Sequence, residues 1–284
     1  MKKTFTGIII LFIGLFSHSY SEQIEKEEIR KTLHVAGNAE TRRLLVDNIN
    51  GSISITGYSG SEIEVIAHKT IRAESSDKLQ EAKEKVTLEM SSEGDRAIVY
   101  VNAPWRDKDG CINNRGWNYY GYDVDYDVEL RVPEKMNIIL KTINNGDIMV
   151  KNIQGHFEVS NINGAVEMKD IAGSGSASTI NGNVTVTFTQ NPGAVSSFKT
   201  INGKVDVQFQ KNLSADLTMS TMNGEVYTDF DVKDVPRLHP IHKSNGRKNV
   251  FKSGDSFTVQ TGGGGPELSF ATLNGNIYIV SSEN

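Results

Sequence analysis

One eight-residue pattern recurs along this chain of 284 residues and constrains its fold more than any other feature. Each copy joins an Asn-Gly pair to alternating apolar and polar residues, as in Thr-Ile-Asn-Gly-Asn-Val-Thr-Val at 179–186 and Thr-Ile-Asn-Gly-Lys-Val-Asp-Val at 200–207. The central copies lie 18, 18, 21 and 21 residues apart, which is typical of a repeat architecture. The Asn-Gly pairs of the seven copies begin at Asn50, Asn145, Asn163, Asn181, Asn202, Asn223 and Asn274.

Each copy predicts a tight corner followed by a half-buried strand. Asparagine and glycine tolerate positive φ, so the pair can turn the chain sharply. Side chains of a strand alternate between two faces, so the apolar residues after the corner should form one buried face. The predicted core positions are Ile53, Ile55, Ile148, Val150, Val166, Met168, Val184, Val186, Val205, Val207, Val226, Ile277 and Ile279.

Two all-β architectures fit this pattern. A second turn signal between the corners, such as Gln154-Gly155, gives each repeat two strands and two corners. In a parallel β-solenoid of 18–21-residue Asn-Gly repeats, equivalent residues of successive coils stack about 4.8 Å apart. In an antiparallel β-meander, Asn-Gly instead forms a hairpin turn at one edge. The near-identity of neighbouring copies favours the solenoid, because stacking places like residues side by side and allows ladders of Ile, Asn and Val.

The remaining chain differs from the repeats. Residues 22–43 are predicted as a charged leader, and 44–284 as a single β-solenoid domain. One short helix is predicted near 73–86, where Ser75 and Ser76 can cap its first turn and Glu and Lys alternate at helical spacing. Strands are expected at 87–90, 97–102 and 123–132.

The first 21 residues resemble a Sec-type signal peptide. Two lysines precede the apolar run 4–16, and small residues precede a predicted cleavage after Ser21. The run is shorter than the roughly 20 residues that span a bilayer, although an uncleaved anchor stays an alternative. We therefore expect a protein exported to the periplasm, the cell surface or the medium, and not an integral membrane protein after cleavage. The net charge of −5 gives no reason to expect a nucleic-acid partner.

The aromatic segment 104–126 is the strongest candidate binding site. Both tryptophans and four of the nine tyrosines of the chain fall within it, among Asn, Asp and Arg residues. Exposed rings in such surroundings can stack on a sugar or dock a protein. The alternative is that the loop buries its rings and caps an open end of the β-structure. The predicted ligand-binding residues are Trp105, Trp117, Tyr119, Tyr120 and Tyr122.

Other polar clusters give weaker signals. Asp123, Asp125 and Asp127 share one strand face, but the spacing of a calcium-binding loop is missing, so a solvated face is expected. The basic insert 237–252 interrupts the repeat and is expected to be a solvated loop; an acidic polymer or membrane surface is its alternative partner. His239 and His242 flank Pro240 and have no clear third ligand. No metal, cofactor or catalytic residue is predicted.

Several phrases resemble the DUF4097-type adhesin family of bacterial exported proteins. They are the opening phrase Leu45-Val-Asp-Asn-Ile-Asn-Gly-Ser-Ile-Ser-Ile-Thr-Gly-Tyr58, the Thr-x-Asn-Gly strands, and the closing phrase Gly262-Gly-Gly-Gly-Pro-Glu-Leu-Ser-Phe-Ala-Thr-Leu-Asn-Gly275. The resemblance covers roughly residues 44–280 and implies a β-solenoid on an exported protein. It implies no shared ligand and no catalytic residue.

These observations predict an exported, non-catalytic, adhesin-like or envelope interaction module. Its partner would be an unknown envelope glycan or protein. Two alternatives stay open at this point: a polysaccharide-active enzyme on the same scaffold, and a purely structural envelope protein. A column of carboxylates along one groove would favour the enzyme.

Overall fold

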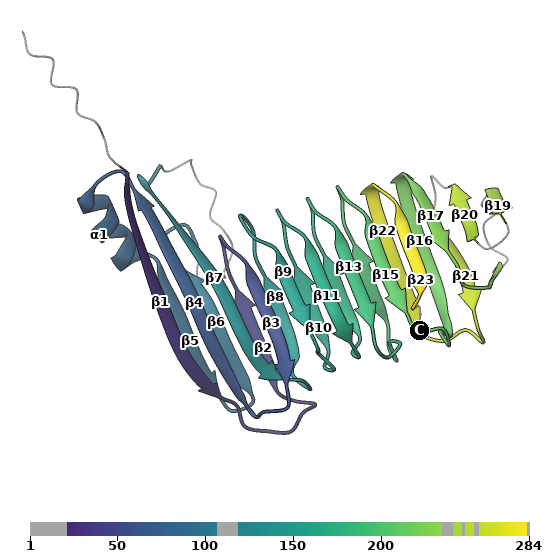
Figure 1. Cartoon of the computed structure of the whole chain (residues 1–284), viewed down its shortest axis with the longest axis horizontal. Helices are drawn as coiled ribbons and strands as arrows, with labels where there is room; N and C mark the ends of the chain where they lie inside the picture. Colours follow the sequence, from purple (N-terminus) through teal and green to yellow (C-terminus); the bar gives the residue numbers. More distant parts are fainter. Residues whose placement is uncertain (1–21, 107–118, 235–240, 246–247, 253–255, 283–284) are drawn as a thin grey trace, which may run out of the picture.

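The structure, a computed structural model, consists almost entirely of β-strands in two large mixed sheets (Figure 1). It describes residues 22–106, 119–234, 241–245, 248–252 and 256–282, and the side chains only outside 234–255. Within these ranges one α-helix is present, α1 (Ser76–Lys85). The predicted all-β class and the single short helix are therefore confirmed.

The first sheet, called sheet A, has 12 strands within the described residues. In spatial order they are β1 (Gln23–His34), β4 (Glu62–Ala73), β7 (Tyr122–Pro133), β3 (Ile53–Tyr58), β9 (Ile148–Lys151), β11 (Val166–Ile171), β13 (Val184–Phe188), β15 (Val205–Phe209), β23 (Ile277–Ser281), β17 (Glu225–Thr228), β20 (Lys248–Lys252) and β19 (Ile241–Asn245).

The second sheet, called sheet B, has 11 strands within the same ranges. Their spatial order is β18 (Val232–Asp234), β21 (Phe257–Thr261), β16 (Ala215–Asn223), β22 (Glu267–Asn274), β14 (Ser196–Lys199), β12 (Gly175–Ser178), β10 (Phe157–Ser160), β8 (Asn137–Lys141), β2 (Arg43–Asp47), β6 (Arg96–Asn102) and β5 (Thr87–Glu93).

In the repeat region, consecutive strands alternate between the two sheets. From β8 to β15 every strand is followed by one in the opposite sheet, and neighbours within a sheet are parallel. Val166 therefore lies opposite Val184, and Val184 opposite Val205. Equivalent residues of successive copies are direct neighbours, as the similarity of the copies predicted. Antiparallel pairing, which a meander uses, joins β1, β4 and β7, β5 and β6, and strands around the insert.

The core lies between the two sheets. All the predicted core positions are buried, because the period-2 alternation directs one face of every strand inward. Phe188 of sheet A stacks on Phe209 at 5.1 Å between ring centroids and meets Phe198 of sheet B edge-on at 6.0 Å. Phe198 in turn stacks on Phe270 at 5.4 Å. This aromatic column packs the two sheets directly against each other.

The last copies of the pattern are out of sequence order in space. The copy at 272–279 pairs in parallel with the copy at 200–207 on one side and with the copy at 221–228 on the other. The chain thus leaves a gap after β15, forms β16 and β17 further along, and returns through β21 to fill the gap with β22 and β23. We use "coil" for one repeat unit, that is, a sheet B strand, its corner and the following sheet A strand. If these units followed one another in sequence order, β23 would lie beyond β17.

The N-terminal end is covered by charged strands and the helix. Residues 22–43, expected as a leader, contain β1, which pairs antiparallel with β4 along its whole length. This edge strand is rich in Glu, Lys and Arg, and such charges discourage edge-to-edge association. Lys31 of β1 donates from Nζ to the Met90 carbonyl of β5 at 2.6 Å, and Lys83 of α1 pairs with Glu25 at 2.7 Å.

Helix α1 begins as the sequence predicted. The hydroxyl of Ser75 accepts a hydrogen bond from the backbone N–H of Lys78 at 3.2 Å, which is an N-cap contact. At its other end the helix holds a buried cation: Lys69 of β4 is 5% exposed and donates from Nζ to the Val86 carbonyl at 2.9 Å. Burial lowers the pKa of Lys69, because the charged amine has lost most of its water.

Candidate functional site

The corners of the repeats carry four positions with four separate roles. In Thr-x-Asn-Gly, the threonine points inward and is buried. Thr179, Thr200 and Thr272 donate from Oγ1 to the carbonyls of Gly164, Gly182 and Gly203 in the preceding coil, at 2.8, 2.8 and 2.9 Å. Each threonine therefore satisfies a glycine carbonyl that a buried corner would otherwise leave unpaired.

The corner asparagines form a continuous hydrogen-bonded ladder. Asn163 donates from Nδ2 to Oδ1 of Asn144, Asn181 to Asn163 and Asn202 to Asn181, each at 2.8 Å. The ladder then passes to the last copy, because Asn274 donates to Asn202 at 2.7 Å and Asn223 to Asn274 at 2.8 Å. The asparagine contacts therefore follow the spatial order of the copies and not their order in the sequence.

The corner glycines are needed for close approach between coils. A Cβ on Gly182 would lie 2.2 Å from the Gly164 carbonyl oxygen, which no side chain tolerates. Positive φ at the asparagine, the reason given by the sequence argument, applies at Asn145 alone among the corner asparagines, with φ of 61°. In that copy Asn144 occupies the ladder and Asn145 is an inserted residue, so the repeat is one residue longer there.

In five of the seven copies the x position points outward, and these residues form an exposed apolar row. Asn181 donates its backbone N–H to the Ile162 carbonyl, Asn202 to Ile180 and Asn274 to Ile201, so these residues are neighbours in successive coils. The side chains of these isoleucines, and of the x residues in the two C-terminal copies, are 36–63% exposed. We call this row the apolar ladder; it consists of Ile162, Ile180, Ile201, Leu273 and Met222.

A row of small and basic residues lies beside the apolar ladder. Each is an outward residue of a sheet B strand, two residues before the x position of its copy, and these residues pair in register from β8 to β16. With the ladder, most of them line one shallow groove that runs across the coils. We call them the flanking row: Lys141, Ser160, Ser178, Lys199, Ala271 and Ser220.

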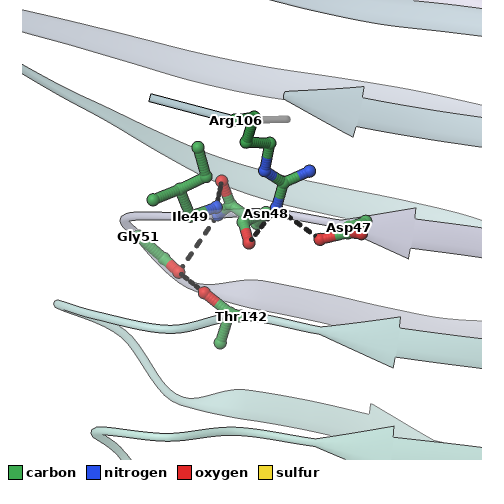
Figure 2. Close-up of polar contacts among 6 residues, drawn as sticks. All are labelled: Asp47, Asn48, Ile49, Gly51, Arg106 and Thr142. Carbon is green, nitrogen blue, oxygen red and sulfur yellow. Dashed lines mark hydrogen bonds and ion pairs between the residues drawn. The ribbon is translucent and has the colours of Figure 1, made fainter. Parts of the chain in front are cut away.

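Beyond Ile162 the row continues through the half-buried Ile143 and ends at the first copy, beside Arg106. Ile49, the equivalent residue of that copy, is buried at 3% exposure. Figure 2 shows Arg106 beside it, donating from Nη2 to Asp47 Oδ1 at 2.5 Å and to the Asn48 carbonyl at 3.2 Å. The Asn48 amide replaces the corner threonine and donates to the Gly51 carbonyl at 3.1 Å. The polar contacts of Arg106 and Asn48 therefore bound this end of the row.

The predicted aromatic site lies largely against the protein core. Trp105 packs on Tyr120 and Tyr122 with centroid distances of 5.0 and 6.3 Å, and Tyr122 is buried at 7% exposure. Burial raises the pKa of Tyr122 to about 12. Tyr119 is 81% exposed and donates its hydroxyl to Glu74. Trp117, with Cys111, lies outside the described residues, so these rings stay a predicted site.

The other polar candidates are engaged in contacts of their own. Asp125 pairs with Arg72, and Asp127 Oδ1 accepts hydrogen bonds from the N–H and hydroxyl of Ser52 at 2.9 and 2.6 Å. No cluster of three or more His, Cys, Asp or Glu residues that could hold a metal ion occurs in the described ranges. His239 lies outside these ranges, and the insert is described only through the backbone of β19 and β20.

Three acids on the outer face of sheet A are paired with neighbours of the same coil or the next. Asp147 Oδ1 accepts the N–H of Ala165 at 2.7 Å, Glu167 pairs with Lys169 at 2.5 Å, and Asp206 pairs with Lys204 at 2.7 Å. These contacts stabilise coil stacking and local strand conformation.

Sequence reasoning identified the repeat but missed the apolar ladder. The signal was present, because x in Thr-x-Asn-Gly is Ile, Ile, Met or Leu in the later copies. When each copy is considered alone, an apolar residue beside Asn-Gly is predicted to be buried in the core. Its exposure follows the inward and outward alternation of the sheet B strand: the threonine points into the core, so x, the next residue, points outward.

Comparisons with known proteins give distant structural matches. No family model matches the chain, and no curated protein matches it. A candidate cell adhesion protein from Clostridium sporogenes matches with 12% identity and a TM-score of 0.37, over 91% of this chain and 100% of that chain. A candidate adhesin from Bacteroides fragilis matches with 10% identity and a TM-score of 0.36, over 90% and 97%.

A candidate lipid binding protein from Parabacteroides distasonis also matches, with 11% identity and a TM-score of 0.28, over 92% of this chain and 97% of that chain. The DUF4097 resemblance thus stays a prediction from the motifs. Across its described part, the chain contains no helix with the length and apolar character needed to cross a membrane.

Proposed function

We propose that this protein is an exported, non-catalytic envelope interaction module, adhesin-like in the broad sense, that binds its partner along the apolar ladder. We infer that the repeat region is a parallel β-solenoid of two sheets, which acts as a rigid support. The alternation of consecutive strands between sheets A and B and the parallel register support this fold.

The observation that carries the proposal is the exposure of five apolar residues in one unbroken row. Isolated apolar side chains on a surface are ordinary, but a contiguous row of them marks an interaction site. Four of the five residues follow a buried threonine that is hydrogen-bonded to the neighbouring copy, and Ile162 follows Asn161, whose amide donates to the Gly146 carbonyl. Each of the five precedes a member of the asparagine ladder. A partner would therefore meet a preorganised surface, with little loss of conformational freedom on binding.

Catalysis is not favoured by the outward carboxylates. A glycosidase needs two carboxylates facing a common substrate, with one held as a general acid. Asp147 is occupied by the Ala165 N–H, and Glu167 and Asp206 are paired with lysines. These acids serve the scaffold, which supports the interaction module over the enzyme.

The test is retention on envelope fragments. The chain beginning at Glu22 is compared with Ile180→Ser/Ile201→Ser on bacterial envelope preparations that contain lipid, glycan and protein. We expect the double variant to lose most of its retention, while Met149→Ser/Val195→Ser retains it. Met149 and Val195 are 46% and 67% exposed and lie outside the ladder, so this control removes equal apolar chemistry elsewhere. Equal retention of both variants and the unsubstituted chain would refute the proposal.

A second binding site at the aromatic segment is proposed on the exposure of Tyr119, which precedes Tyr120 in the sequence, and on the packing of Tyr120 against Trp105. Tryptophan fluorescence tests it, with acrylamide quenching and titration of envelope glycans. Comparison with Trp105→Phe separates the two tryptophans. Protection of the Trp117 signal by a glycan would support the site, and rings inaccessible from the outset would make the segment a structural cap.

A further inference from the structure

We propose that the partner of the apolar ladder is an anionic lipid bilayer surface, on which the ladder lies flat with its five side chains among the acyl chains. The inference rests on the proposed function, because it names the occupant of the same surface.

The chemistry of the row favours hydrocarbon. The five side chains are Ile, Leu and Met, with no aromatic ring to stack on a sugar. The carbonyls of Ile162, Ile180 and Ile201 already accept hydrogen bonds from the next coil. The strands that lead into the ladder, β10, β12, β14, β22 and β16, have paired neighbours on both sides, so a peptide finds no free sheet edge there. What the row offers is aliphatic contact.

The width of the row argues against a second copy of this chain. Stable protein interfaces involve about 20–30 residues a side, whereas the ladder is one residue wide and five residues long. Neighbouring coils lie about 4.8 Å apart, so the row extends over about 19 Å. A narrow, straight row can instead enter the boundary between headgroups and acyl chains, as the apolar face of an interfacial helix does.

The charge of the flanking row selects anionic headgroups. Its two ionisable residues are Lys199, at the middle of the ladder, and Lys141, at its N-terminal end. The remaining members are serine or alanine, and the row contains no acid, although the whole chain has a net charge of −5. Lysine beside an inserted apolar side chain can reach the phosphate level, where its attraction to an anionic surface strengthens binding.

The experiment is co-sedimentation with protein-free vesicles of phosphatidylcholine alone or mixed with phosphatidylglycerol. The chain beginning at Glu22 retains every described element and lacks the apolar run 4–16, which would itself bind lipid. We expect binding to the anionic vesicles that falls about tenfold in Ile180→Ser/Ile201→Ser and is unchanged in Met149→Ser/Val195→Ser. Lys199→Glu should weaken binding to anionic vesicles and leave any residual binding to the neutral ones unchanged.

The outcomes separate the two proposals. No binding to anionic vesicles, or equal losses in the ladder variant and its control, overturns the lipid inference. If the lipid inference fails in this way but the ladder variant loses retention on envelope fragments, the proposed function stands and the partner is a glycan or protein. If the lipid inference fails and the ladder variant keeps its retention on envelope fragments, both proposals fail. Equal binding to neutral and anionic vesicles overturns the role of the flanking lysines. Circular dichroism of each variant confirms that it is folded.

Discussion

Asn181 donates from Nδ2 to Oδ1 of Asn163 at 2.8 Å, although 18 residues separate the two in the sequence. The Oδ1 atom of Asn181 in turn accepts a hydrogen bond from Nδ2 of Asn202. An asparagine serves this arrangement because its amide is both donor and acceptor, so each coil can bond to the coils before and after it. The ladder thus explains why the residue before the corner glycine is asparagine.

Asn181→Asp should destabilise the protein by about 1 kcal/mol at neutral pH, because a carboxylate cannot donate to Asn163 Oδ1 and is repelled by it. Repulsion raises the pKa of the new carboxyl in the folded state. The stability of the Asn181→Asp protein is therefore retained at low pH, where the new acid is protonated, and is lost as pH rises through the folded pKa of that acid. Chemical denaturation between about pH 3 and pH 7 measures this trend.

Asn212→Asp is the matched control for the ladder variant. Asn212 accepts from Asn191 through Oδ1 at 3.1 Å, and a carboxylate accepts equally well. We expect little change in the free energy of unfolding over the same pH range. A comparable loss in both variants would show that the ladder has no special role.

Gly182→Ala should cost about 1–3 kcal/mol or more, because the new Cβ would lie 2.2 Å from the Gly164 carbonyl oxygen. Gly193→Ala is its control, since a Cβ there meets no atom within 4 Å. Thermal unfolding of the two variants measures the difference. If both shift the midpoint equally, close approach between coils is not what requires glycine at the corner.

These contacts also show how far the sequence could be interpreted. Alternation after Asn-Gly correctly predicted which side chains are buried, because a strand leaves only two faces to choose between. It gave the wrong reason for the asparagine, since φ is a local property and the ladder joins residues of different coils. The insertion at Asn145 was invisible for the same cause: two adjacent asparagines fit the pattern in either register.

Lys69→Met should raise the free energy of unfolding at pH 7 by on the order of 1 kcal/mol, because it removes the cost of burying a charge. The Val86 carbonyl keeps the Tyr126 hydroxyl as a donor at 3.2 Å. Desolvation lowers the pKa of Lys69 below its ordinary 10.5, so the unfolded state binds the proton more tightly. The stability of the unsubstituted protein therefore rises as pH increases from the folded pKa toward 10.5.

Denaturation with guanidinium at about pH 7 and about pH 10, for the variant and the unsubstituted chain, measures this difference. The variant lacks the titrating amine, so its advantage should shrink at the higher pH. Lys199→Met, at an exposed position, should show no such dependence. A gap that is constant with pH would mean that Lys69 is not destabilised by burial.

Removing residues 262–284 should unfold the C-terminal coils rather than shorten the protein by one coil. β22 and β23 lie between β14/β15 and β16/β17, so their loss separates strands that have no other connection within the sheets. Hydrogen exchange should show lost protection in 215–228 as well as at the new terminus. Removing only 283–284 serves as the control. Protection of 215–228 that survives the larger deletion would contradict the observed strand order.

The sequence by itself determined the local structure: the strands, the corners, the inward faces and the capped helix. Each of these depends on residues within one repeat or one turn, where alternation, glycine and capping chemistry act directly. Tertiary structure decided the pairing of β1 with β4, the place of β22 and β23 between earlier coils, and the alignment of the exposed x residues into one apolar ladder. Nearly identical copies are interchangeable to local chemistry, so only the chain connections and the available partners could choose among them.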